Sequence, residues 1–140
     1  MKRTPYKKLK DKTWKLCSLY IRLKDANENG RVRCYTCPPR RRARLYTKMQ
    51  AGHFIPGRTN GILFDERGMR PQCPACNIFG GGKPIEFMIA LEKELGQKEA
   101  IKLRDELIKQ KNTVTPLSML DLAEWIRYFE GKLEELGYEE

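Results

Sequence analysis

Two short segments decide how this chain folds: Cys34-Tyr-Thr-Cys37 and Cys73-Pro-Ala-Cys76-Asn77. Each Cys-x-x-Cys pair brings two thiolates to one side of a tight turn, and two such pairs predict a tetrahedral structural zinc site. The 35 residues between the pairs exceed the roughly 15–20 of common zinc fingers, so a unit the size of a hairpin lies inside the clasp. The competing interpretation is four unrelated core thiols.

Length and composition indicate one globular domain, since the 140 residues are 33% charged and 40% apolar. No apolar run approaches the roughly 18 residues of a membrane span, and the N-terminus lacks the apolar region of a signal peptide. We therefore expect a soluble protein without membrane association, located in the cytoplasm, where thiols stay reduced. The fifth cysteine, Cys17, lies on the apolar face of an expected helix, which predicts a buried core thiol rather than a fifth ligand.

Positive charge is concentrated in the first half of the chain. Residues 1–76 contain 19 Lys or Arg against 5 Asp or Glu, whereas residues 77–140 contain 9 against 13. This asymmetry predicts that a polyanion, in practice nucleic acid, contacts the basic half, although charge runs are often simply solvated. The expected DNA contacts are Arg40, Arg41, Arg42 and Arg44 in an exposed loop, with Lys48, Arg58 and Arg67.

The chain divides into three expected regions. Residues 1–10 form a basic arm, partly disordered, that meets phosphates. Residues 11–82 contain the zinc-stapled core with an N-terminal helix, and residues 83–140 are a helical C-terminal region. Apolar periodicity and capping residues predict helices over 11–25, 84–95, 98–111 and 115–136, a short helix from residue 77, and strands over 31–34, 50–55 and 62–64.

The only histidine, His53, lies between the cysteine pairs. A neutral imidazole can take a proton from water, which hydrolysis of a phosphodiester requires. A hard ion such as Mg²⁺ would stabilise the developing charge and needs oxygen ligands. Asn77 can supply one, and Asp65 and Glu66 are the only carboxylates between the pairs. The simpler interpretation of His53 is a hydrogen-bonded ring at the end of a strand.

Three segments carry a resemblance to a known family: Ala51-Gly-His-Phe54, Phe64-Asp-Glu-Arg67 and Pro71-Gln-Cys-Pro-Ala-Cys-Asn77. With the cysteine pairs, they resemble HNH (ββα-metal, His-Me finger) endonucleases. The closer resemblance, over most of the chain, is to the NinG (Rap) family of lambdoid phage recombination proteins, which are nucleases of branched DNA. The resemblance implies an α+β fold, with a zinc-stapled ββα-metal core between an N-terminal helix and a C-terminal helical region.

By position, the resemblance implies that His53 is the general base and that Asn77 is a ligand of a catalytic Mg²⁺ or Mn²⁺. The four cysteines match the structural zinc ligands. Two glycines depart from the pattern: Gly52 stands where many HNH enzymes have an aspartate ligand, and Gly68 stands where the middle asparagine would fall. Glu66 or Asp65 could supply the missing carboxylate; the other role for both is a turn-forming ion pair with Arg67.

The expected function is that of a metal-dependent, structure-selective DNA endonuclease. It would hydrolyse phosphodiester bonds in branched recombination intermediates such as Holliday junctions or D-loops, in the host cytoplasm if it is phage-encoded. A two-fold homodimer would suit a four-way junction, with the last helix as a candidate interface; internal packing explains that helix equally well. One alternative is a non-catalytic, zinc-dependent DNA-binding accessory protein of recombination. Another is a zinc-stapled module that binds protein.

Overall fold

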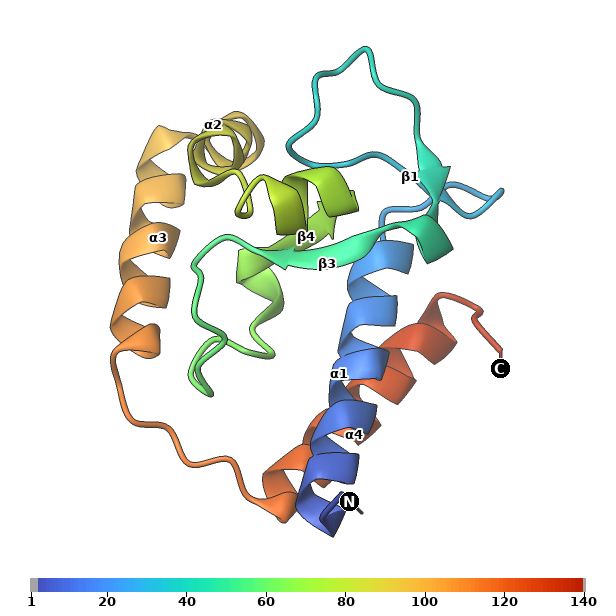
Figure 1. Cartoon of the computed structure of the whole chain (residues 1–140), viewed down its shortest axis with the longest axis vertical. Helices are drawn as coiled ribbons and strands as arrows, with labels where there is room; N and C mark the ends of the chain where they lie inside the picture. Colours follow the sequence, from blue (N-terminus) through green and yellow to red (C-terminus); the bar gives the residue numbers. More distant parts are fainter. Residues whose placement is uncertain (1–2, 140) are drawn as a thin grey trace.

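The computed structural model describes residues 3–139, which combine helices with two small antiparallel sheets (Figure 1). No helix in that range is long and apolar enough to cross a membrane. The elements are, in order, α1 (Pro5–Leu23), β1 (Arg31–Val32), β2 (Arg44–Leu45), η1 (Tyr46–Lys48), β3 (Gln50–His53), η2 (Glu66–Gly68), β4 (Met69–Gln72), η3 (Ala75–Phe79), α2 (Pro84–Leu95), α3 (Gln97–Lys111) and α4 (Met119–Glu135).

Helix α1 begins six residues earlier than predicted. Thr4 caps it by accepting a hydrogen bond from the Lys7 backbone N–H, and Pro5 occupies the first turn, where its missing N–H costs nothing. Asp11 is therefore not the cap but forms an ion pair with Lys7 one turn away. Residues 5–10 of the expected basic arm therefore belong to this helix, and the contact of the arm with phosphates stays a prediction. Residues 1–2 lie outside the described part of the chain.

The central hairpin pairs β3 with β4, so that Gly52 faces Arg70 and His53 faces Met69 across the two strands. The predicted strand at Ile62–Phe64 is wrong, because residues 61–64 form a turn whose apolar side chains fill the core. The second strand is β4, which tolerates Pro71 because a two-stranded sheet has free edges. Of the strand predicted over 31–34, only the first two residues are confirmed, and they pair with β2.

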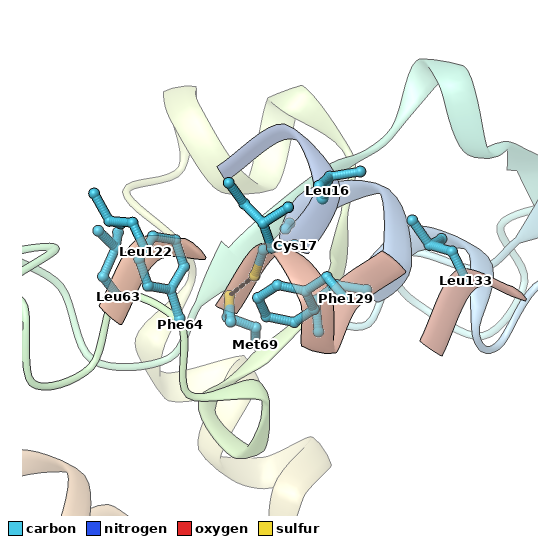
Figure 2. Close-up of a cluster of buried hydrophobic side chains, with 11 residues drawn as sticks. Leu16, Cys17, Leu63, Phe64, Met69, Leu122, Phe129 and Leu133 are labelled. Atoms are coloured by element: carbon cyan, nitrogen blue, oxygen red, sulfur yellow. Dashed lines mark hydrogen bonds between the residues drawn. The ribbon is translucent and has the colours of Figure 1, made fainter. Parts of the chain in front are cut away.

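The largest core cluster lies where the first and last helices meet the hairpin. Helix α4 packs along α1, and α1 also covers β3 and β4 (Figure 1). Figure 2 shows Cys17 pointing at Met69, with 3.9 Å between the two sulfur atoms. Burial raises the pKa of the Cys17 thiol, and the prediction of a buried core thiol is confirmed. The cluster comprises Leu16, Cys17, Ile21, Ala51, Leu63, Phe64, Met69, Leu122, Ile126, Phe129 and Leu133.

The apolar face of α4 is used inside the molecule. Leu122, Ile126, Phe129 and Leu133 recur at helical spacing and are all buried against this cluster. Helix α4 starts after Ser118, which forms a capping box with Asp121, rather than after the predicted cap Thr115. Much of the stripe predicted as a possible dimer interface therefore packs internally, but Leu120 and Leu136 are exposed, and a homodimer stays a prediction.

Helices α2 and α3 cover the other side of the core. Helix α2 has its predicted bounds, and α3 begins one residue before its predicted start. Phe87 and Leu91 of α2 and Leu107 of α3 pack against Phe54 and Ile55, which follow β3. The short helix expected from residue 77 is a π-helical turn, η3, that begins two residues earlier, inside the second cysteine pair.

Candidate zinc centre and the His53 site

The four paired cysteines converge at one point. Their Sγ atoms all lie within 4.8 Å of one another, and the Cys37 Sγ lies 3.6 Å from that of Cys73 and 3.7 Å from that of Cys76. Zinc–sulfur bonds of about 2.3 Å in a tetrahedron separate the sulfurs by about 3.8 Å, so the cluster fits a zinc ion. Burial raises the pKa of the Cys37 and Cys76 thiols, whereas at Cys73 the effect of burial is outweighed by hydrogen bonds from Cys76 and Cys37, which lower the pKa to about 7.

The clasp fastens the first cysteine pair to the hairpin and to η3. The backbone N–H of Tyr35, inside the first pair, donates to the Pro71 carbonyl of β4 at 2.9 Å, and the N–H of Cys73 donates to the Cys34 sulfur at 3.2 Å. Val32 and Met49 pack beside the buried cysteines. The centre therefore fixes the end of β4 and the start of η3 relative to the first pair.

His53 lies at the end of β3 with its ring held on two sides. Nε2 lies 3.1 Å from the Leu63 carbonyl oxygen, and the ring stacks on Trp14 of α1, with centroids 5.5 Å apart and planes 17° apart. A carbonyl oxygen can only accept, so Nε2 carries the proton and Nδ1 keeps a free lone pair in the neutral ring. Burial, helped by the charge of Arg58 and opposed by the Leu63 carbonyl, lowers the pKa of His53. The ring is therefore neutral at pH 7.

Arg58 lies against the same indole. Its guanidinium carbon is 4.2 Å from the centroid of the Trp14 ring, which is cation–π distance. Arg58 has φ +48°, in the left-handed region that side chains other than glycine rarely adopt, and Gly57 before it has φ +112°. The contacts among Arg58, Trp14 and His53 join a loop, the first helix and the hairpin. The spacing of these residues in the sequence could not reveal that they lie together.

Asn77 belongs to η3, and its side chain faces the start of β3. The amide Nδ2 donates to Gln50 Oε1 at 2.8 Å, which leaves the Asn77 carbonyl oxygen free of that bond. Gln50 and His53 occupy opposite ends of a four-residue strand, separated by about 10 Å of strand length. The structure thus places Asn77 beside Gln50, without a hydrogen bond to His53.

The two carboxylates between the cysteine pairs are engaged elsewhere. Asp65 accepts from Arg67 at 2.9 Å and from Gln110 at 2.9 Å, so the predicted ion pair with Arg67 is present for this residue. Glu66 instead accepts from the Tyr128 hydroxyl at 3.1 Å, and its second oxygen is buried without a partner. Within residues 3–139, neither carboxylate forms a hydrogen bond with His53 or Asn77.

A residue that the sequence did not single out, Gln72, explains Gly52. A Cβ atom added at Gly52 would overlap the Gln72 side-chain oxygen. The Gln72 side chain is fully buried and donates to the Thr36 hydroxyl at 2.9 Å and to the Gly82 carbonyl at 2.9 Å. An aspartate at position 52 does not fit while Gln72 lies there. Gly68 is also constrained, because its Cβ would lie 2.8 Å from a methyl group of Leu107.

Most of the predicted DNA-binding side chains are accessible. Arg67 differs from them, because Asp65 and Glu106 hold its guanidinium. Arg44 lies in β2 and is half-buried, so it is less accessible than the other predicted contacts. The exposed members of the predicted set, apart from Arg67, are Arg40, Arg41, Arg42, Lys48 and Arg58.

Comparison with known proteins places the chain in a family. The model of the family described as "Bacteriophage Lambda NinG protein" matches residues 1–139. A search of curated proteins and a search of solved structures found no match. Because the family model spans nearly the whole sequence, the chain belongs to the NinG family.

Proposed function

We propose that this protein is a structure-selective DNA endonuclease that cuts branched recombination intermediates of the Holliday-junction or D-loop type. Membership of the NinG family indicates a function related to phage recombination. The observation that carries the catalytic part is the His53 ring, whose Nε2 is held by a carbonyl and whose Nδ1 is free in the neutral state. Such a ring is prepared to accept a proton.

In the proposed reaction, His53 Nδ1 takes a proton from a water molecule as the water oxygen bonds to phosphorus. The bond from phosphorus to the 3′ oxygen of the DNA breaks, and that oxygen takes a proton from solvent. Trp14 and the Leu63 carbonyl hold the imidazole plane, so the lone pair keeps one direction throughout. General-base catalysis of this kind contributes about 10²–10⁴ in rate.

The residues of the structure fit one of the two predicted metal ions better than the other. The four cysteines fit structural zinc, which would fasten the hairpin that carries His53. A catalytic Mg²⁺ or Mn²⁺ usually needs one or two carboxylates, but Asp65 and Glu66 bind other side chains and Gln72 fills the space at Gly52. The set of oxygen ligands for a divalent ion is therefore incomplete. That the reaction requires such an ion stays a prediction.

DNA binding is proposed for the exposed basic residues near the zinc centre. Arg40, Arg41 and Arg42 lie on the loop between the first cysteine pair and β2, and all three are exposed. Phosphate contacts of this kind release counterions, so affinity should fall steeply as salt rises. A module that binds only protein would show little such dependence.

The test is cleavage of labelled four-way junction, flap and duplex DNA by zinc-loaded protein, with and without Mg²⁺ or Mn²⁺. We expect junction cleavage by the wild type and a loss of at least about 100-fold in His53→Ala, with zinc content and far-UV spectrum unchanged. Added imidazole should restore part of the activity of His53→Ala. A wild type that nicks none of these substrates, or a variant that cuts equally well, would rule out the nuclease.

A second candidate is a zinc-dependent DNA-binding protein without catalysis. The specific support for it is the engagement of both central carboxylates and the filled space at Gly52. It predicts salt-dependent junction binding by wild type and His53→Ala alike, and no cleavage under any metal condition.

A further inference from the structure

The loop that follows β3 presents a single cation to the His53 site. The loop carries Arg58 in the left-handed conformation, and its next residues are fastened to the C-terminal half of the chain. The Thr59 hydroxyl donates to the Lys111 carbonyl at 3.2 Å, and the Asn60 amide donates to the Thr115 carbonyl at 3.1 Å. Backbone strain of this kind persists where surrounding contacts determine it, and it is common at functional sites.

Arg58 has no carboxylate partner within residues 3–139, unlike Arg67 and Arg70, which form ion pairs with Asp65 and Glu94. Its guanidinium rests instead on Trp14, which also stacks on His53. The two contacts place the guanidinium carbon no more than about 10 Å from the centre of the imidazole. A phosphate that contacts the guanidinium and a water molecule that contacts the imidazole can together span such a separation, since each contact takes about 3 Å.

We propose that Arg58 is a second catalytic residue, which binds the scissile phosphate beside His53 and neutralises its developing charge, while Trp14 holds the guanidinium when DNA is absent. This inference rests on the proposed nuclease function. Attack on a phosphodiester spreads additional negative charge over the phosphoryl oxygens, and that charge needs a fixed cation. Arginine suits this role because its planar fork donates two parallel hydrogen bonds to a phosphate.

The energetics favour transfer of the guanidinium from indole to phosphate. A cation–π contact at an exposed site is weak, whereas charge-assisted hydrogen bonds are roughly twice as strong as neutral ones. Arg58 is exposed, so little has to be uncovered for this transfer. The charge of Arg58 also contributes, after burial, to the lowered pKa of His53.

The test compares Arg58→Gly, Arg58→Lys and Lys98→Ala in single-turnover cleavage at saturating junction DNA. Glycine accepts the positive φ of residue 58, so Arg58→Gly removes the guanidinium without backbone strain. We expect Arg58→Gly to cut about 100-fold more slowly with similar affinity, and Arg58→Lys to recover only part of the rate. Lys98→Ala, the matched control, removes an exposed cation of α3 outside the predicted DNA contacts and should leave the saturated rate intact.

Two further measurements separate catalysis from folding. Added guanidinium ion should restore part of the rate of Arg58→Gly, which a purely structural defect would not allow. A methylphosphonate at the mapped cleavage position removes the phosphate charge that Arg58 would neutralise, and should therefore narrow the difference in cleavage rate between wild type and Arg58→Gly. If Arg58→Gly cuts like the wild type while His53→Ala does not, the Arg58 role is overturned and the nuclease stands; if the wild type does not cut, both fail.

Discussion

The two faces of the β3–β4 hairpin are held by different forces. On one face, Ala51 and Met69 pack into the apolar cluster formed with α1 and α4. On the other, Gln72 bonds to Thr36 and Gly82 beside four cysteines that can hold a metal. Alternate residues of a strand point to opposite sides, so four-residue strands serve both environments. A bound metal can therefore stabilise the hairpin on its polar face, where apolar burial is absent.

Removal of zinc should have the largest effect of any change to this fold. Structural zinc contributes on the order of 10 kcal/mol in small domains. We expect chelation, or Cys73→Ser, to unfold the β1–β4 and η3 region, measured by metal analysis and denaturant unfolding. Cys17→Ala is the matched control, because it removes a buried thiol and should leave the zinc stoichiometry at its wild-type value. Unchanged unfolding after complete loss of metal would show that the polar face needs no ion.

Truncation of the apolar face should be less severe and should spare the metal. Phe129 is fully buried, stacks on Trp125 and contacts Tyr20 of α1. Phe129→Ala should lower the free energy of unfolding by about 3–5 kcal/mol, while the folded fraction still binds zinc as the wild type does. Phe79→Ala, at a side chain that is 85% exposed, should cost less than about 0.5 kcal/mol. A joint loss of zinc in Phe129→Ala would mean that the two faces are not separable.

A substitution at Gly52 tests whether Gln72 sets the shape of the polar face. Gly52→Ala should destabilise by about 1–3 kcal/mol, because the added Cβ overlaps the Gln72 side-chain oxygen. In a Gln72→Ala background the same substitution should cost less, which a double-mutant cycle from urea unfolding measures. Gly131→Ala serves as control: its Cβ meets no atom within 4 Å, and alanine favours the α4 helix. Equal costs in both backgrounds would contradict the overlap.

The smallest expected effect is the pH dependence of stability that His53, at the end of β3, contributes. Burial lowers the pKa of folded His53 below its ordinary value of about 6.5, so the unfolded chain binds a proton first as pH falls. His53 should therefore contribute stability that is fully present above about pH 6.5 and is lost as pH drops below it. The difference in urea midpoint between wild type and His53→Gln isolates this contribution. An NMR titration that gave His53 a pKa above its ordinary value would reverse the sign.

Much of the helical framework was predictable, because its signals are local. Pro84 and Gly96 bound α2, and apolar periodicity gives α3 within one residue. The failures have a common cause in tertiary packing. The apolar run at Ile62–Phe64 has the same sequence pattern whether it forms a strand or a turn that fills the core. Only tertiary packing determines which of the two structures it adopts.

The candidate site shows the same division. The cysteine cluster follows from spacing, and His53 follows from being the only histidine between the pairs. Sequence spacing could not reveal that Trp14 and Arg58 stack beside it, or that Gln72 fills the space at Gly52. These contacts join residues 20 to 44 positions apart, and such distances are set by the fold alone.

The packing of the first helix against the last has a consequence for synthesis on the ribosome. All four cysteines have been translated once Cys76 is made, whereas α4 follows more than 40 residues later. During that interval the chain can bind metal while Leu16, Cys17 and Ile21 of α1 still lack their final cover. We therefore expect the nascent protein to pass through an open stage that can hold metal and exposes apolar surface, and a chain that terminates before α4 to stop there, prone to aggregation.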